Sequence, residues 1–331
     1  ANGMFVQEMS ASGMAQAGAV VAGGDRPASL FQNAANLAFI PGFNLEFTGT
    51  TYFPTGTITD RQGIKSHPKS DGIFTPHLFF SAKITDWLTF GFGEFVDFGL
   101  ATTWPKDWAA NYIVTNSGLN SFTFNPNFAF GPWKGFAFAI GFDAKWGAVT
   151  IERALTTGDK QGLMKMGGSA WGFGANAGFM YQPAWWVRMG AGYRTGISMK
   201  LNNGKVHFAD MPEAFAPRFP DQKFKSSISL PHLVSMGARF WVFNNEDREL
   251  SIEADGWATL WKSYDKLEFK FNEGLGGYYD KNYNIKTQIS YQKYMQTGQA
   301  RLGAECKFMK KMLAARLGFL WDGRSEERRV G

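Results

Sequence analysis

Large apolar side chains occupy every second position through most of the chain. From Phe136 to Ala148 the even positions carry Phe, Ile, Trp and Ala, whereas the odd positions carry Gly, Ala, Asp143 and Lys145. The same alternation returns around Trp171 and again beyond residue 185. A sustained period of two indicates β-strands, because successive side chains of a strand point to opposite faces.

The second face of these strands distinguishes two kinds of β protein. In a soluble sandwich the apolar face forms the core and the other face carries long, solvated polar side chains. Here the other face carries Gly, Ala and isolated charges, which suits the crowded polar interior of a membrane barrel whose outside meets lipid. We therefore predict a transmembrane antiparallel β-barrel, with a soluble β-sandwich or lectin as the alternative.

The connections between strands follow the pattern of an outer-membrane barrel. Short turns alternate with long polar connections, as periplasmic turns and external loops do in such barrels. Tryptophans such as Trp87 and Trp133 lie beside the short turns, and others such as Trp146 and Trp171 lie about one membrane crossing away, which suggests two aromatic girdles. Short turns are expected at 85–86, 131–134, 182–184, 244–247 and 309–311, and long connections at 54–71, 103–120, 155–169, 202–226 and 271–284.

The alternation predicts about eleven strands. Closed single-chain bacterial barrels have an even number of strands, so an odd count means either that a strand is miscounted or that the barrel is incomplete. We expect the barrel at 42–323 and interpret residues 324–331, which show no alternation, as an artefactual tail outside it. The strands are expected at 42–53, 72–84, 87–104, 121–131, 135–154, 170–182, 185–202, 226–243, 248–270, 285–308 and 311–322.

Residues 1–41 differ from the rest of the chain. They are rich in Gly, Ala and Ser, lack the period of two, and end at Pro41-Gly42. Such a segment is either a flexible tail or a plug folded into the lumen, and the small lumen-facing residues of the strands leave room for a plug. We therefore expect an N-terminal hatch at 1–41. The chain opens without a charged n-region, so if it is exported this is the mature form.

Composition narrows the possible functions. The 331 residues include 39 Gly, 32 Phe and 12 Trp, with a net charge of +6. The basic residues are spread along the chain, so no nucleic-acid partner is expected. No apolar run approaches the roughly 18 residues of a transmembrane helix. One cysteine, Cys306, and four scattered histidines provide neither a disulfide scaffold nor a metal site, and no cofactor is expected.

Catalytic and nucleotide-binding motifs are also missing. The glycine-rich stretches at 172–178 and 190–196 lack the strand-then-helix context of a nucleotide loop, and their glycines fall on the lumen-facing parity. An outer-membrane hydrolase is the enzyme alternative. Only His77 among the histidines has inward parity, and no nucleophile motif accompanies it. We therefore predict that the protein is not an enzyme.

A series of short motifs runs in order from residue 3 to about residue 322. They are Phe5–Ala17 (FVQEMSASGMAQA), Asn33-Ala34-Ala35, Phe98–Thr102 (FGLAT), Ile151-Glu152-Arg153, Trp171–Gly178 (WGFGANAG) and Leu230-Pro231. Together they resemble the long-chain fatty acid outer-membrane transporter family, which includes aromatic hydrocarbon transporters. The resemblance implies a fourteen-stranded barrel, of which about eleven strands are present here, with a hatch that plugs its lumen.

Candidate binding residues follow from the resemblance and from the external loops. Arg153 matches the family position that holds the substrate carboxylate, which a guanidinium can grip with two charge-assisted hydrogen bonds. The alternative is a structural ion pair with Glu253 or Asp255. Lys293 is the candidate second carboxylate partner. Apolar loop residues either form a capture groove or pack on neighbouring loops; they are Phe208, Met211, Phe215, Phe219, Leu163 and Met164.

The gate is implied by the resemblance. Gly99 lies at the family's kink in the third strand, where the wall opens sideways, and the hatch residues Phe5 and Asn33 are expected near it. A plain packing glycine is the alternative. Ala34, which precedes Ala35, replaces the family's hatch proline, so a switch that depends on that proline is in question. The connection at 155–169 is also shorter than its family counterpart, which reduces the expected capture surface.

The leading hypothesis is passive uptake of hydrophobic small molecules, above all long-chain fatty acids, across a Gram-negative outer membrane. The substrate is expected to land on the loop groove, descend to Arg153, displace hatch contacts and leave through the wall at Gly99. The barrel is expected to be a monomer in contact with outer-membrane lipid and lipopolysaccharide. The alternatives are an aromatic or alkane hydrocarbon transporter of the same family, or a general aqueous porin.

Overall fold

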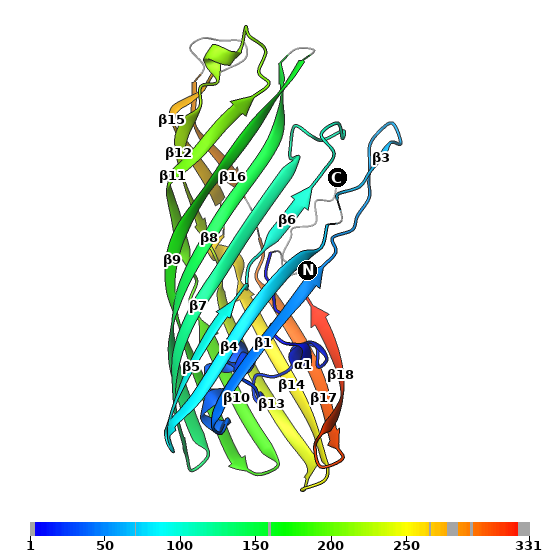
Figure 1. Cartoon of the computed structure of the whole chain (residues 1–331), viewed down its shortest axis with the longest axis vertical. Coiled ribbons are helices and arrows are strands. Elements are labelled where there is room, and N and C mark those ends of the chain that lie inside the picture. The colour runs from blue at the N-terminus through cyan, green and yellow to red at the C-terminus, as the bar shows by residue number, and fades with distance from the viewer. Residues whose placement is uncertain are drawn as a thin grey trace.

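The computed structural model describes residues 4–69, 71–157, 160–264, 266–276, 284–291 and 294–323. Within these ranges the chain is mostly antiparallel β-sheet (Figure 1). The strands are β1 (Phe43–Tyr52), β2 (Ile58–Thr59), β3 (Lys65–Ser66), β4 (Ile73–Thr85), β5 (Leu88–Phe95), β6 (Leu100–Thr103), β7 (Asn116–Trp133), β8 (Phe136–Thr157), β9 (Lys160–Ala184), β10 (Val187–Arg194), β11 (Ser198–Ala209), β12 (Gln222–Ser229), β13 (His232–Asn244), β14 (Glu249–Leu260), β15 (Lys266–Gly276), β16 (Asn284–Tyr291), β17 (Thr297–Phe308) and β18 (Leu313–Asp322). The helices are α1 (Ala11–Met14), η1 (Pro27–Ser29), α2 (Leu30–Asn33), η2 (Ala34–Phe39), η3 (Ala216–Arg218) and η4 (Trp261–Ser263).

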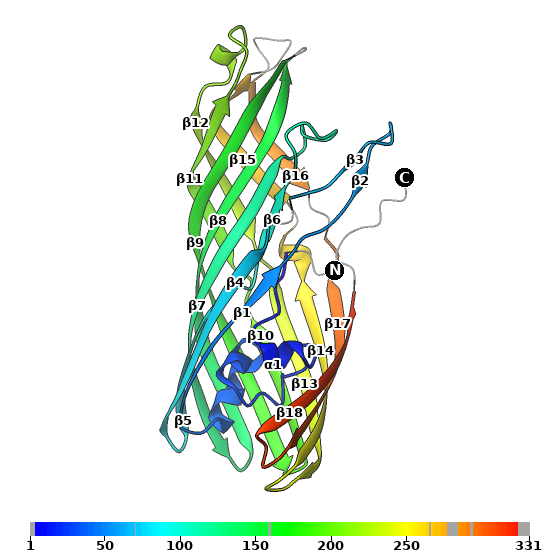
Figure 2. The ribbon, with the colours of Figure 1, turned by 45° about the vertical axis from the view of Figure 1, so that its right-hand side comes forward.

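The long strands form one curved wall. Eleven of them pair in the order β1-β4-β5-β7-β8-β9-β10-β13-β14-β17-β18, which agrees with the predicted number. Their tilt around the N-terminal segment is visible in both ribbon views (Figures 1 and 2). Among the described residues no ladder joins β1 to β18, and no helix is long and apolar enough to cross a membrane. The predicted all-β architecture is confirmed.

Five predicted strands are each divided into two in the structure. They are 87–104, 185–202, 226–243, 248–270 and 285–308. Pro231 gives one physical reason, because it has no N–H to donate to a ladder. Beside it the N–H of Leu230 donates to Ile197 O at 2.8 Å, at the break between β10 and β11. The upper pieces pair in an order of their own, β9-β11-β12-β15-β16.

The predicted long connections at 155–169 and 202–226 are largely strand. β8 and β9 pair continuously up to Thr157 and Lys160, and β11 and β12 run to Ala209 and from Gln222. The Gly and Lys residues of these stretches suggested loops. Their apolar residues alternate nonetheless, and those at Met164, Met166, Val206, Phe208 and Phe224 belong to one buried cluster.

The two faces of the wall match the predicted alternation. On β8, Phe138 and Ile140 are 45% and 55% exposed on the outer face, whereas Ala139 is 1% and Asp143 0% exposed on the inner face. Outward aromatic rings stack from strand to strand, as Phe130 and Phe138 do with ring centroids 4.8 Å apart. The outer surface is therefore an apolar band.

The N-terminal segment, residues 4–41, lies inside the curve of the wall (Figure 2). Most of its residues are buried. Phe31, Leu37 and Ile40 of this segment share one apolar core with wall residues such as Phe95 and Met180. The core of the protein therefore lies between this segment and the inner face of the sheet.

Candidate functional site

The wall is interrupted between β4 and β6. β5 pairs with β4 only up to Leu78, which faces Glu94. When the chain returns to the sheet as β6, it pairs with β7. Among the described residues, the upper part of β4, residues 73–77, therefore has β1 on one side and no strand on the other. Above this gap the N–H of Lys69 donates to Thr103 O at 2.7 Å, so the gap is a bounded window.

The segment that connects β5 to β6, residues 96–99, bonds to the start of the chain. The N–H of Val6 donates to Asp97 O at 2.8 Å, and the N–H of Gly99 donates to Met4 O at 2.9 Å. Residues 4–6 thus form the inner side of the window.

Phe5 lies beside the break. It forms an isolated bridge with Phe98, and the two ring centroids are 5.2 Å apart. On its other side the ring lies 6.2 Å from that of Phe31. Phe5 therefore connects the rim of the window to the core of the N-terminal segment.

Side chains from two strands fix the edges of the break. The N–H of Val96 donates to Nδ1 of His77 at 3.3 Å, so an imidazole accepts a bond that a ladder would otherwise supply. The hydroxyl of Ser121 donates to Phe98 O at 2.5 Å. His77 has the inward position predicted for it and is fully buried.

A buried ion pair lies at the same level on the inner face. Lys145 donates to Asp97, and the hydroxyl of Thr123 donates to Oδ1 of Asp97 at 2.9 Å. Both charged side chains are 1% exposed. Asp97 belongs to the irregular segment itself, so this pair holds the start of the break against β7 and β8.

A cavity of about 550 Å³ occupies the window. Its lining includes Met4, Phe5 and Val6 of the N-terminal segment, and Phe74 and Trp146 of the wall. Phe74 is 57% exposed on the outer face. The cavity therefore extends from the inner segment to the lipid-facing surface.

Gly99 lines this cavity, and its environment is open. A Cβ added there would meet nothing closer than 3.8 Å, the nearest atoms belonging to Leu119, Val6 and Val96. Its backbone also lies outside the left-handed region. Packing does not require glycine at this position, so the alternative of a plain packing glycine has no steric support.

A second apolar cluster fills the upper part of the wall. We call it the upper cluster; it consists of Met164, Met166, Val206, Phe208, Phe224, Phe269, Phe271 and Leu275. Met211 and Phe219 of the connection between β11 and β12 pack against it, with the rings of Phe208 and Phe219 5.4 Å apart. Four of the six predicted groove residues are therefore brought together, in a mostly buried cluster.

The other two groove residues lie apart from this cluster. Leu163 has the opposite parity to Met164 on β9 and faces the other side of the hairpin. Phe215 is half-buried, with the guanidinium of Arg218 5.8 Å from its ring centroid.

Arg153 lies beside the upper cluster. It pairs across the ladder with Met164, and its strand neighbours of the same parity, Ile151 and Leu155, pack against the cluster. Its Nε is buried without a hydrogen-bond partner, and no ion pair to Arg153 is present among the described residues. The structure thus places an unpaired cation next to an apolar surface.

The expected competitors for Arg153 are engaged elsewhere. Glu253 accepts from Arg239 at 2.8 Å, and Asp255 accepts from the N–H of Val21 at 3.1 Å. Lys293, the predicted second carboxylate partner, lies outside the described residues.

A smaller cavity of about 90 Å³ lies between the upper cluster and the window. Its lining includes Met166 and Phe269 of the upper cluster and also Met4 and Leu119. Met4 and Leu119 line the window cavity as well. The two cavities are therefore neighbours that share part of their walls.

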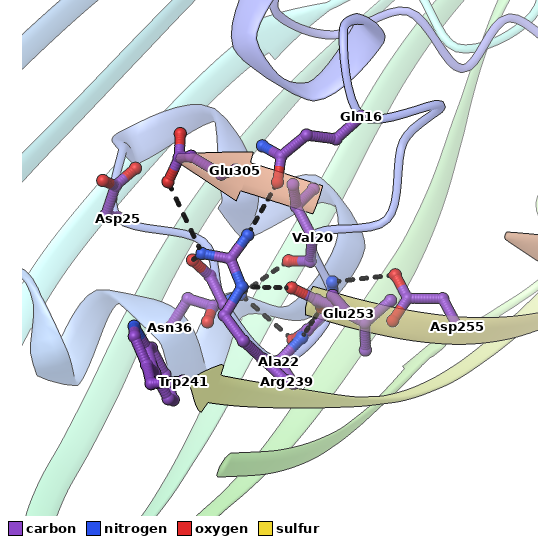
Figure 3. A network of polar contacts seen from close by, with 12 residues as sticks. Gln16, Val20, Ala22, Asp25, Asn36, Arg239, Trp241, Glu253, Asp255 and Glu305 are labelled. Carbon is purple, nitrogen blue, oxygen red and sulfur yellow. Dashed lines mark hydrogen bonds and ion pairs between the residues drawn. The ribbon is translucent and has the colours of Figure 1, made fainter. Parts of the chain in front are cut away.

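A polar network ties the N-terminal segment to β13, β14 and β17 (Figure 3). Arg239, which is 2% exposed, donates to Glu253, to Gly23 O and to Oε1 of Gln16, each at 2.8 Å. The N–H of Ala22 donates to the other oxygen of Glu253 at 2.6 Å. Three bonds from the N-terminal segment therefore converge on one buried guanidinium–carboxylate pair.

Asn33 anchors the segment at a second place. Its side-chain amide donates to Phe179 O of β9 at 3.0 Å, and its Oδ1 accepts from the N–H of Ala35 at 3.1 Å. A Cβ added at Gly178 would lie 2.3 Å from that Oδ1 and 3.2 Å from the N of Ala34, which explains the lumen-facing glycine. These contacts place Asn33 against β9 and not beside Gly99 as expected.

Asp25 makes an ion pair nearer the periplasmic end. Its Oδ2 lies 2.7 Å from Nζ of Lys307. Burial alone raises the pKa of this carboxyl, but the ammonium of Lys307 and the guanidinium groups of Arg239 and Arg26 together outweigh it and hold the pKa of Asp25 below its ordinary value.

Comparison with solved structures identifies the fold. The crystal structure of a Pseudomonas aeruginosa FadL homologue superposes with a TM-score of 0.76 at 16% identity, covering 98% of this chain and 82% of that one. The toluene transporter TodX of P. putida gives 0.70 at 16% identity, with coverage of 97% and 83%. By sequence, residues 1–327 match the family described as outer membrane protein transport protein (OMPP1/FadL/TodX). The chain belongs to this family.

Curated relatives in the FadL/TodX family are distant in sequence. The long-chain fatty acid transport protein of Escherichia coli O6:H1 is 25% identical over 269 residues, 66% of this chain and 59% of that protein. Outer membrane protein P1 of Haemophilus influenzae is 24% identical over 262 residues, 67% of this chain and 54% of that protein. The chain thus spans less than two thirds of the length of these two relatives.

Membership of the FadL/TodX family confirms several predictions. The chain is an outer-membrane β-barrel protein, and the family is described by transport and not by catalysis. Sequence reasoning placed Lys145 on the inner face but missed its partner Asp97, because the period along one strand does not show which residue of another segment it meets. It also missed the contacts of Arg239 with the N-terminal segment, because that segment has no regular pattern from which its contacts could be predicted.

Proposed function

We propose that this protein takes up hydrophobic small molecules across the outer membrane by a lateral route, with long-chain fatty acids as the main cargo. The observation that carries the proposal is the chain of apolar sites that runs from the upper cluster, through the smaller cavity, to the window cavity. A hydrophobic molecule gains no favourable transfer free energy in a water-filled channel. A path that ends at the lipid-facing surface delivers it to the bilayer, where it is removed from water.

The N-terminal segment serves as the hatch in this proposal. It occupies the lower lumen, where an aqueous channel would have to run, and its first residues form the inner side of the window. A small shift of residues 4–6 would widen the route without removing the anchored part around Arg239. The same arrangement argues against a general porin.

Arg153 supports fatty acids over hydrocarbons. An unpaired guanidinium beside an apolar cluster matches a molecule with one carboxylate and a long chain, since charge-assisted bonds are strong where water is excluded. The hydrocarbon alternative is supported by the window cavity, whose lining includes the rings of Phe5, Phe74, Phe122 and Trp146. Long-chain fatty acids are named for the E. coli relative and toluene for TodX.

The outer face above the girdle supports contact with lipopolysaccharide. Lys205 faces Lys223 across one ladder, and Lys225 faces Lys270 across the next. All four are exposed, and Nζ of Lys270 also lies 3.4 Å from Oε1 of Glu268. Like charges directly opposite destabilise a ladder, and the phosphates of lipopolysaccharide would relieve this repulsion.

Replacing Lys205 and Lys225 by Gln should weaken lipopolysaccharide co-purification; unchanged co-purification would argue against this contact.

Filling the window tests the route. Gly99→Trp should place an indole in the window cavity and abolish the uptake of palmitic acid by cells that express the protein. Gly256→Trp is the matched control, because a Cβ there meets nothing closer than 3.7 Å and an aromatic ring is expected on the lipid-facing side of a barrel. Equal uptake by both variants would contradict a lateral exit at this window.

A further inference from the structure

Glu94 is a carboxyl group on the lipid-facing side of the wall. On β5 the odd positions face inward, since a Cβ added at Gly91 would lie 2.3 Å from Leu37 of the N-terminal segment. The even positions, Phe90, Phe92 and Glu94, therefore face outward. Sequence reasoning missed Glu94, although its even position within the alternation already indicates the lipid-facing side.

The surroundings of Glu94 are apolar. Its partners across the two ladders are Leu78 on β4 and Phe124 on β7. The rise from Trp87, at the short turn, to Glu94 is about 17 Å along the membrane normal, at about 3.4 Å per residue and a tilt of about 45°. The apolar band of such barrels is about 25 Å tall, so Glu94 lies within it.

Glu94 has no partner in the described part of the chain. No hydrogen bond or ion pair to its carboxyl is present there. A polar group in hydrocarbon without a partner is costly, and ionisable residues at such positions are typically functional. An apolar residue would be more stable on this lipid-facing surface, so an unpartnered carboxyl group there indicates a function.

The position of Glu94 relative to the window indicates what this function is. The next outward residues above it are Pro76 on β4 and Phe122 on β7, and both line the window cavity, as does the buried Val96 on its own segment. Glu94 is therefore the polar group on the outer face directly below the rim of the cavity, where a molecule that leaves the window first meets lipid.

We infer that Glu94 forms a hydrogen bond with the carboxylic acid group of a fatty acid as it passes from the window into the bilayer. Two carboxyl groups that share one proton can form such a bond, with the protonated group as donor and the other as acceptor. A hydrocarbon has no group to offer. The inference rests on the proposed route, and it adds a second contact for the acid group at the opposite end of the path from Arg153.

The test compares uptake of palmitic acid and hexadecane, which have carbon chains of equal length, by the full chain and its variants in cells without another such transporter. Glu94→Leu should lower the rate of palmitic acid uptake about two- to tenfold, the range that one hydrogen bond provides. It should leave hexadecane uptake unchanged. Glu94→Gln keeps hydrogen-bonding capacity and should retain most of the palmitic acid rate. Phe92→Leu, on the same outward face of β5, is the matched control.

The outcomes separate this inference from the proposed function. No uptake of either compound by the unmodified protein would overturn both. Uptake by the unmodified protein, with Glu94→Leu equal to it or faster for palmitic acid, would overturn the role of Glu94 alone. An equal loss for both compounds would also overturn it, because a structural role affects both. Thermal unfolding of Glu94→Leu should occur at an unchanged or higher temperature, since the change removes an unpaired polar group from lipid.

Discussion

Removing Arg239 should release the N-terminal segment from the wall. In the structure its guanidinium makes three hydrogen bonds, to Glu253, Gly23 O and Gln16, all at 2.8 Å. It is 2% exposed, so water does not replace these bonds. Arg239→Met keeps most of the volume and removes all three.

The size of the effect follows from the burial of the pair. Removing one partner of a buried ion pair costs about 3–5 kcal/mol, because the other charge is left uncompensated. Each 1.4 kcal/mol changes an equilibrium tenfold, so the ratio of detached to attached segment should rise by roughly two to three orders of magnitude. The double variant Arg239→Met, Glu253→Gln removes the stranded carboxylate and should recover part of this loss.

Ion conductance in planar bilayers and limited proteolysis of the N-terminal segment measure the release. Arg239→Met should show higher conductance and faster cleavage than the unmodified protein. Arg248→Met is the matched control, since Arg248 lies in the turn before β14 with its side chain 68% exposed. Unchanged conductance and cleavage in folded Arg239→Met would show that this network does not hold the segment, and that the reasoning from burial is wrong.

Three further predictions concern the binding site, the lipid face and pH. Arg153→Ala should weaken binding of palmitic acid about ten- to a hundredfold, the equivalent of about 1.5–3 kcal/mol for a charged hydrogen bond, in a competition assay where hexadecane serves as control; equal losses would leave Arg153 a structural residue. Ile140→Arg, on the outer face, should lower the free energy of unfolding in lipid by about 2–4 kcal/mol, and an unchanged value would contradict the lipid-facing assignment. The folded-state pKa of Asp25 lies below its unfolded value. Its contact with Lys307 therefore stabilises the attached N-terminal segment fully above about pH 4, and this stabilisation is lost as pH falls through the folded pKa. Ion conductance should rise over that pH range, and Asp25→Asn should abolish this change.

The period of two was sufficient to predict the wall. The sequence alone shows which face of the wall Phe138 and Ala139 occupy. A barrel wall has lipid on one side and the lumen on the other, so alternate residues differ in polarity and size. The interruptions were missed because the alternation continues across them. Pro231 was visible in the sequence, yet its neighbours on both sides fit one uninterrupted pattern.

The site was predictable only in part. Phe208 and Met164 stood out because each is an apolar residue in a polar stretch, and both lie in the upper cluster. The window depends on where β5 separates from β4. The hydrogen bond between Val96 and His77 that marks this point could not be predicted, because no pattern in the sequence indicates it. Asn33 was expected near the break from the family resemblance alone, and its position in the chain does not show which strand it contacts in the folded segment.

The most direct test of the account is a crystal structure of the protein with palmitic acid that carries bromine at the end of its chain. We expect anomalous density for bromine in the smaller cavity or the window cavity, with the carboxylate within hydrogen-bond distance of Arg153. Bromine density confined to the outer surface of the wall, or a carboxylate bound away from Arg153, would contradict it.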